Sequence, residues 1–219
     1  TDGRAFRWEG RGAGIDEVLW AGGQRTLVAV SPDGTRVVTA EKGAVRVWRI
    51  RPSGRVLRLP IDRDAMSASF SPDGRHVVFA SLNGTVYVAG MEPGDAPRVI
   101  ARHDAVPCTD TAFSPDGRLV ATAGHDPWVR LIDPATGDEV AARELTRVEW
   151  PSDRCASVRW APDGRRLAVT APDGRVHVLD ARTLALERIL AANLPWPRAL
   201  RFSRDGRLMQ TWRGGSVSP

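Results

Sequence analysis

Residues 111–123 read TAFSPDGRLVATA, in which a Ser-Pro-Asp-Gly tetrapeptide separates two short, mainly apolar segments. The tetrapeptide is typical of a tight turn, because proline presets the backbone angle φ at the first corner and glycine accepts the left-handed conformation that closes the turn. Each flanking segment has the length of a β-strand. The stretch therefore predicts a β-hairpin.

The same hairpin recurs along the chain. Copies or close variants of the tetrapeptide begin at Ser31, Ser71, Ser114, Ala161 and Ser203, so that successive turns lie 40 to 47 residues apart. A period of this length, with strands on both sides of each turn, is typical of the blades of a β-propeller and is too long for leucine-rich or ankyrin repeats. The repeat predicts one blade for each copy.

Each complete repeat contains two further segments that read as strands. A third strand follows a loop at 43–48, 84–88, 128–133 and 174–180, and its alternation predicts apolar residues facing inward and polar residues facing outward. A fourth, more polar segment, such as 139–142, is expected at the outer edge of the sheet. We therefore predict an all-β fold built from four-stranded antiparallel blades.

The most complete repeat runs from His103 to Asp133 and contains Thr122, Asp126 and Ile132 at characteristic places. This pattern resembles the WD40 family of β-propellers, whose repeats carry a hydrogen-bonded network of His, Ser/Thr, Asp and Trp. His103, Thr122 and Asp126 match three members of that network, and Ile132 stands at the Trp position. The resemblance is to bacterial-type WD40 repeats with Ser-Pro-Asp-Gly turns, and it extends over essentially the whole chain.

The three matching residues allow two interpretations. A histidine, a carboxylate and a hydroxyl are also the parts of a nucleophilic triad. The resemblance instead implies a structural network of His103, Thr122 and Asp126 that ties a loop to the hairpin and satisfies buried polar groups. We favour the structural interpretation and predict no catalytic residue.

The repeats also suggest how the chain is divided. If each repeat is one blade, the chain comprises a half blade at 1–20, blades at about 21–60, 61–102, 103–146 and 147–191, and a half blade at 192–219. The two half blades could pair to close a five-blade ring. However, residues 214–217 resemble the opening of another third strand, which would compete for the same place. We therefore favour a segment of a longer propeller, with the closed ring as the alternative.

Composition excludes several classes of protein. The 219 residues are 42% hydrophobic and 26% charged, which is typical of a globular protein, and the longest apolar runs are far too short to span a bilayer. The first ten residues do not read as a signal peptide. The net charge of +5 is spread along the chain rather than clustered, which argues against nucleic acid as a partner.

Cofactor and metal signals are weak. Cys108 and Cys155 are too few for a disulfide scaffold or a zinc site built on thiolates, so we expect free thiols and a cytoplasmic location. His125 and Asp126 beside His103 could suggest a metal, but a second carboxylate at ligand spacing is missing. The chain has no glycine-rich phosphate loop followed by Lys-Ser/Thr. We predict neither a metal nor a cofactor.

Aromatic and arginine residues mark the expected docking surface. The resemblance implies that the loops joining strand four to strand one and strand two to strand three share the rim around one mouth of the central channel. Tryptophan and arginine are enriched at binding hot spots. The candidates for partner binding are Trp128, His125, Trp150, Arg102, Trp196 and Arg25. An alternative for Trp150 is that it fills the space left by the missing family histidine.

These observations favour a non-enzymatic scaffold for a protein or peptide partner, within a larger bacterial signalling or regulatory protein. An open propeller would expose strand edges and could self-associate. One alternative is a TolB-like or peptidase-associated propeller, against which Trp48 and the Thr136-Gly137 pair argue. The other is a propeller enzyme with a site at the channel mouth, which the absence of clustered carboxylates or histidines disfavours.

Overall fold

The computed structural model describes residues 4–7, 17–21, 28–41, 44–49, 57–61, 64–92, 94–103, 107–145, 157–171, 173–190, 199–207 and 209–212. Every regular element in these ranges is a β-strand. None of these residues belongs to a helix that is long and apolar enough to cross a membrane.

Four of the repeats each form one antiparallel sheet with its four strands in chain order. The strands are β3 (Val28–Val30), β4 (Arg36–Glu41), β5 (Ala44–Arg49) and β6 (Leu57–Pro60); β7 (Ala65–Phe70), β8 (His76–Ser81), β9 (Thr85–Gly90) and β10 (Arg98–Arg102); β11 (Cys108–Phe113), β12 (Val120–Gly124), β13 (Trp128–Ile132) and β14 (Glu139–Glu144); and β15 (Val158–Trp160), β16 (Arg166–Thr170), β17 (Val176–Asp180) and β18 (Leu186–Leu190). The prediction of an all-β fold with four-stranded antiparallel blades is confirmed.

Two shorter sheets complete the described structure. One pairs β1 (Arg4–Arg7) with β2 (Glu17–Ala21), and the other pairs β19 (Ala199–Phe202) with β20 (Met209–Trp212). In the described part of the chain they are separate two-stranded sheets, and no ladder joins one to the other. Whether the propeller closes as a five-blade ring or extends further stays a prediction.

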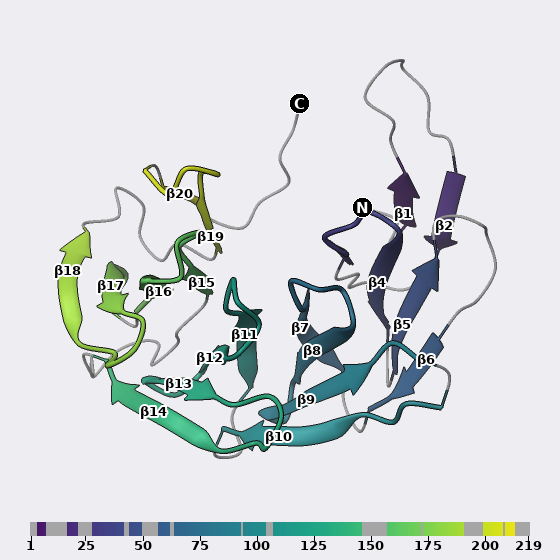
Figure 1. Cartoon of the computed structure of the whole chain (residues 1–219), viewed down its shortest axis with the longest axis horizontal. Coiled ribbons are helices and arrows are strands. Elements are labelled where there is room, and N and C mark those ends of the chain that lie inside the picture. Colours follow the sequence, from purple (N-terminus) through teal and green to yellow (C-terminus); the bar gives the residue numbers. More distant parts are fainter. Residues whose placement is uncertain are drawn as a thin grey trace.

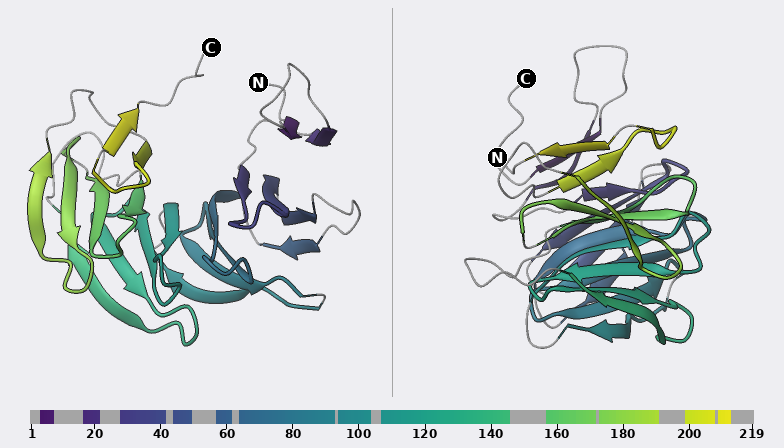
Figure 2. Two further views of the ribbon diagram at one scale, coloured as in Figure 1. Left: turned by 45° about the horizontal axis from the view of Figure 1, so that its top comes forward. Right: turned by 90° about the vertical axis from the view of Figure 1, so that its left-hand side faces the viewer.

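The sheets follow one another around an arc, with the fourth strands β6, β10, β14 and β18 on its outside (Figure 1). The first strands β7, β11 and β15 contact their neighbours on the inner side. Figure 2 shows the two-stranded sheets at the two ends of this arc. The arrangement brings one strand from each blade to the centre, where side chains from different repeats can meet.

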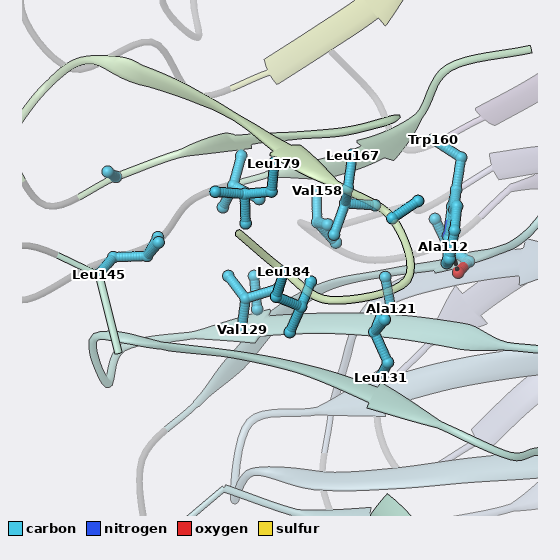
Figure 3. Close-up of a cluster of buried hydrophobic side chains, with 14 residues drawn as sticks. Ala112, Ala121, Val129, Leu131, Leu145, Val158, Trp160, Leu167, Leu179 and Leu184 are labelled. Carbon is cyan, nitrogen blue, oxygen red and sulfur yellow. Dashed lines mark hydrogen bonds between the residues drawn. The ribbon is translucent and has the colours of Figure 1, made fainter. Parts of the chain in front are cut away.

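The hydrophobic core lies between the blades rather than inside them. Figure 3 shows one such layer, in which Val129 and Leu131 of β13 meet Val158, Leu167 and Leu179 of the next blade. All five side chains are fully buried. Because the removal of apolar surface from water drives folding, these layers hold neighbouring blades together.

The blade formed by β7–β10 is covered on both faces. Phe79 and Tyr87 stack with ring centroids 5.2 Å apart in the layer toward β3–β6, whereas Val78 and Val88 belong to the layer toward β11–β14. The prediction of a half-buried third strand is therefore wrong for β9, whose residues are nearly all buried. Neighbouring blades cover both faces of the sheet, so polar residues are not needed on either side.

The Ser-Pro-Asp-Gly turns form as predicted. The glycines of these three turns and of the two variants that begin at Ala161 and Ser203 have φ between 67° and 74°, in the left-handed region that glycine adopts without strain. In the turn at 114–117, the Ser114 hydroxyl donates to Asp116 Oδ1 over 2.6 Å. Consecutive turns also touch: a Cβ built on Gly117 would lie 3.5 Å from Pro72 Cδ, and one on Gly206 would lie 3.4 Å from Pro162 Cδ. We call this stacked set of turns the turn ring.

Candidate functional site

Two clusters of polar side chains lie at the ends of the sheets that are opposite the turn ring. Successive connections of an antiparallel sheet alternate between its two ends, so the connections β8–β9, β12–β13 and β16–β17 share one face. We call this face, formed by residues 82–84, 124–127, 171 and 173–175, the loop face. The opposite face, which carries the turn ring, is called the turn face.

The first cluster is centred on His103, which is 1% exposed. Its Nδ1 lies 3.0 Å from both carboxylate oxygens of Asp126, and its Nε2 lies 3.0 Å from Thr122 Oγ1. Because an ionised carboxylate can only accept hydrogen bonds, a proton on Nδ1 satisfies Asp126 and leaves Nε2 to accept one from the Thr122 hydroxyl. Arg130 Nη1 lies 3.0 Å from the same Nδ1 and, as a donor, is satisfied by Asp126 instead. Arg130 Nη1 also donates to Asp126 Oδ2 over 2.9 Å.

His103 joins two blades. Its backbone N–H donates to Gly84 O over 2.9 Å in the β8–β9 turn, while its ring is held by β12 and the β12–β13 turn. Gly124 leaves room for this ring, because a Cβ there would lie 2.8 Å from Pro107 O and 3.0 Å from His103 Nδ1. Any side chain at position 124 would therefore displace the histidine or the preceding loop.

The electrostatics of the cluster favour an ionised Asp126. Burial opposes ionisation, but the hydrogen bond from His103 and the hydrogen bond and charge of Arg130 outweigh it and hold the pKa of Asp126 below its usual range. The Thr122 hydroxyl belongs to a residue that is 0% exposed, and both ring nitrogens of His103 are engaged within the protein. This geometry supports a structural network and leaves no accessible nucleophile at Thr122.

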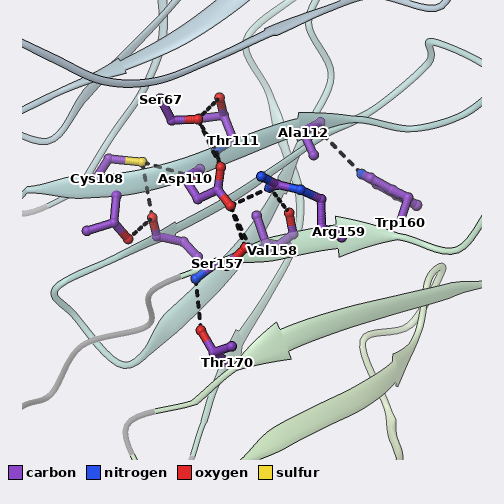
Figure 4. Close-up of polar contacts among 12 residues, drawn as sticks. Ser67, Cys108, Asp110, Thr111, Ala112, Ser157, Val158, Arg159, Trp160 and Thr170 are labelled. Atoms are coloured by element: carbon purple, nitrogen blue, oxygen red, sulfur yellow. Dashed lines mark hydrogen bonds and ion pairs between the residues drawn. The ribbon is translucent and has the colours of Figure 1, made fainter. Parts of the chain in front are cut away.

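The second cluster joins three blades through one buried carboxylate (Figure 4). Asp110 of β11 accepts hydrogen bonds at Oδ1 from Ser67 Oγ of β7 over 2.9 Å and from Thr111 N over 3.0 Å. Its Oδ2 accepts from Ser157 Oγ over 2.8 Å and from Val158 N over 3.1 Å. Because Asp110 pairs with Ala123, next to the β12–β13 turn, the cluster lies toward the loop face.

Arg159 of β15 neutralises this carboxylate. Its Nη1 contacts Asp110 Oδ2, and its side chain remains 38% exposed, whereas that of Asp110 is 9% exposed. The pair therefore brings a positive charge to the surface at the inner side of the arc. A buried charge requires such a partner, since an isolated carboxylate is costly to remove from water.

Sequence reasoning missed this cluster, although the repeat contains a signal for it. Ser67, Asp110 and Ser157 each stand four residues before a turn tetrapeptide, at equivalent places on successive first strands. Alignment of the repeats on their turns shows three polar residues where a buried strand is expected. The WD40 pattern drew attention to positions within one repeat, whereas these partners are one repeat apart.

Three predicted partner-binding residues surround the His103 network. Trp128 is half-buried, and its backbone N–H donates to Asp126 Oδ1 over 3.3 Å. Arg130 Cζ lies 5.7 Å from the centroid of the Trp128 ring. Arg102 is exposed, and its Nη1 donates to Thr85 Oγ1 over 3.0 Å. His125 is half-buried, and its N–H donates to Pro107 O over 2.8 Å. All three residues therefore stand next to residues of the His103 network, at strand ends or turns of the loop face.

The remaining predicted residues, Trp150, Trp196 and Arg25, lie outside the described residues, as does Cys155. Cys108 is a free thiol that is 0% exposed. Burial, followed by the negative charges of Asp110 and Asp126, raises the pKa of this thiol far above its usual range. Cys108 therefore lacks the thiolate character of a reactive cysteine.

Comparison with known proteins identifies one family and several relatives. The family described as the lipoprotein LpqB beta-propeller domain matches residues 58–183. The meiotic recombination protein rec14 of Schizosaccharomyces pombe is 28% identical over 113 residues, which are 51% of this chain and 37% of that protein. The periodic tryptophan protein 2 homolog of the same organism is 31% identical over 125 residues, which are 48% of this chain and 15% of that protein.

Two further similarities extend this result. The WD repeat-containing protein SL1-17 of Schistosoma mansoni is 26% identical over 112 residues, covering 50% of this chain and 36% of that protein. The matched part of this chain thus spans between 15% and 37% of the length of these three relatives. The crystal structure of the Myceliophteria thermophila Cps50 (Swd1) beta-propeller domain superposes with a TM-score of 0.80 at 17% identity, over 96% of this chain and 73% of that one. At this identity the similarity concerns the fold alone.

Proposed function

This chain belongs to the LpqB beta-propeller domain family and is a WD40-repeat β-propeller, and from that premise we propose that it binds a protein or peptide partner on the loop face as a non-enzymatic scaffold. WD40 propellers commonly act as interaction scaffolds. We further propose, from the resemblance to bacterial-type WD40 repeats alone, that the chain serves within a larger bacterial signalling or regulatory protein.

The placement of Trp128 and Arg102 around the His103 network is the observation that carries this proposal. Both side chains stand on strand ends that the network fixes, since His103 follows Arg102 directly and Asp126 accepts from Trp128 N. Side chains held this way lose little conformational freedom on binding, which favours affinity. An aromatic ring and a guanidinium also combine large contact area with a polar group.

The buried polar clusters around His103 and Asp110 favour a scaffold over an enzyme. A nucleophile must reach its substrate, and the only hydroxyl that His103 contacts among the described residues is the fully buried Thr122. Asp110 likewise accepts hydrogen bonds from Ser67, Ser157 and three backbone or side-chain N–H donors. The polar side chains of the first cluster are used to hold one repeat together, and those of the second are used to join three blades.

The test compares two variants against a partner isolated by affinity capture. Trp128→Ala removes a proposed anchor, whereas Arg188→Ala removes an exposed charge from β18, the outer strand of the next blade. We expect Trp128→Ala to weaken binding by roughly thirtyfold and Arg188→Ala to change it by less than about twofold. Thermal melting of Trp128→Ala confirms that the variant is folded.

Titration at two salt concentrations separates this proposal from nucleic-acid binding. Dependence on many scattered arginines would make affinity fall steeply with salt. If Trp128→Ala binds like the wild type while Arg188→Ala binds weakly and the salt dependence is steep, the loop face is not the docking surface.

A further inference from the structure

A groove of about 600 Å³ opens on the turn face, on the side of the molecule opposite the proposed docking surface. It lies between the blade β7–β10 and the blade β11–β14. Its apolar lining comes from Pro72, Val88, Ala89, Phe113, Pro134 and Ala135. The volume falls within the range of pockets that bind ligands in proteins, and it exceeds what a single small ion fills.

Two carboxylates from neighbouring turns of the turn ring stand at this groove. Oδ1 of Asp73 accepts from Ser71 Oγ over 2.5 Å and from Arg75 N over 2.9 Å, and Asp116 repeats the arrangement in the next blade. The serine hydrogen bond, followed by the backbone N–H, lowers the pKa of each carboxyl, so both are ionised at neutral pH. The second oxygen of each accepts no hydrogen bond from the described residues.

The lining is acidic although the chain as a whole is basic. Asp95 is a third carboxylate at the groove, and its Oδ2 accepts from Glu92 N over 2.8 Å. Arg98 is the one guanidinium among the described residues that line the groove, and its Nη2 donates to the carbonyls of Pro134 and Ala135. The exposed His76 is the remaining titratable lining residue. In a protein of net charge +5, this groove therefore favours a cation.

We propose that the groove binds an arginine or lysine side chain carried by an extended segment of a partner protein. The cationic end contacts the free oxygens of Asp73 and Asp116, and the aliphatic stem and flanking residues lie against Val88, Ala89 and Phe113. Long basic side chains bury their methylene groups in this way while keeping the charge beside polar groups. This surface is separate from the loop face, so the protein would have two docking surfaces on opposite sides.

The experiment titrates the full chain, labelled with ¹⁵N, with the peptide acetyl-Gly-Ser-Arg-Ser-Gly-amide and follows the backbone amide signals. A second peptide carries citrulline, which has nearly the shape of arginine but no charge. We expect saturable shifts at the amides of Val88, Ala89 and Gly117 with the arginine peptide and none with the citrulline peptide. Spermidine serves as a small cation without a peptide backbone.

Matched variants assign the effect to the groove. Asp73→Asn with Asp116→Asn keeps one oxygen for the turn hydrogen bonds and removes both charges, and we expect affinity to fall about tenfold. The matched control is Asp33→Asn with Asp205→Asn, which changes the same position in two turns outside the groove, where the serine contacts are also 2.5 Å. It should leave the affinity for the peptide within about twofold of the wild type. Ala96→Arg places an internal cation at the groove and should abolish binding even if the first pair fails to fold.

Several results would overturn the proposal. Equal shifts with the arginine and citrulline peptides would remove the role of charge, and equal losses from the two pairs of variants would remove the role of the groove. Binding of spermidine as tight as that of the peptide would identify a site for small amines instead of a docking surface. The absence of saturable shifts up to millimolar peptide would leave no site at all.

Discussion

Replacing Asp126 with alanine should destabilise the protein by about 2 to 3 kcal/mol, and the contacts of this residue explain the size of the effect. The change leaves the buried Nδ1–H of His103 without an acceptor, which costs about 1 to 3 kcal/mol. Arg130 loses less, about 1 kcal/mol or below, because it keeps Glu139 Oε2 at 3.3 Å. The Trp128 N–H loses only a long contact of 3.3 Å.

Asp126→Asn provides the graded comparison. Its side-chain oxygen can still accept from His103 Nδ1, so the variant should lose mainly the charge beside Arg130, about 1 kcal/mol. The control is Glu187→Ala, which breaks an exposed ion pair with Arg166 at 2.9 Å and should cost less than about 1 kcal/mol.

Urea denaturation at neutral pH, with a check that the slope is unchanged, measures all three variants. Thermal melting should show a decrease of roughly 4 to 12 °C for Asp126→Ala, since 1 kcal/mol corresponds to about 2 to 4 °C at this chain length. If Asp126→Ala unfolds at the same urea concentration as the wild type or as Glu187→Ala, the structural network around His103 contributes nothing and the reasoning is wrong.

Two other predictions concern the same interior. The pKa of Asp126 is lower in the folded state than in the unfolded chain, so the stability that the ionised carboxylate contributes is present above about pH 4 and is lost as the pH falls through the lowered value. Urea denaturation of the wild type and of Asp126→Asn across this pH range should therefore give free energies of unfolding that converge at acid pH. A difference that stays constant with pH would contradict the assignment. Asp110→Ala should lower the free energy of unfolding by about 3 to 5 kcal/mol, because hydrogen-bond donors from three blades lose their acceptor. Ser67→Ala removes only one of these donors and should lower it by about 1 kcal/mol. Similar urea midpoints for the two variants would show that Asp110 does not join the blades.

Local sequence patterns predicted the features whose causes are local. The turn at 114–117 follows from its proline and glycine, and the contacts among His103, Thr122 and Asp126 fall within one repeat. Features that depend on the neighbouring repeat were missed. The burial of β9 on both faces depends on which sheets cover it, and Asp110 meets Ser67 and Ser157 only after three blades have packed together.

The groove on the turn face illustrates the same limit. Asp73 and Asp116 were identified only as members of turns, and their turn roles are confirmed by the serine and backbone hydrogen bonds. Each carboxylate, however, has a second oxygen directed away from those bonds. Only the distance between neighbouring blades decides whether such oxygens share one space, and no pattern within a single repeat contains that distance.

The turn ring repeats one contact at successive junctions between repeats. Each turn presents its proline to the following repeat and its glycine to the preceding one, so Gly74 meets Pro32, Gly117 meets Pro72 and Gly164 meets Pro115 in the same manner. A repeat duplicated or deleted by recombination would still find this proline–glycine contact at its turn, whereas the contacts of Asp110 with Ser67 and Ser157 belong to one particular set of blades. The turn at 203–206 is the exception, because Arg204 has no pyrrolidine ring to offer a glycine. Placing proline at position 204 would supply the missing surface, on which the turn glycine of a grafted blade could pack as Gly117 packs on Pro72.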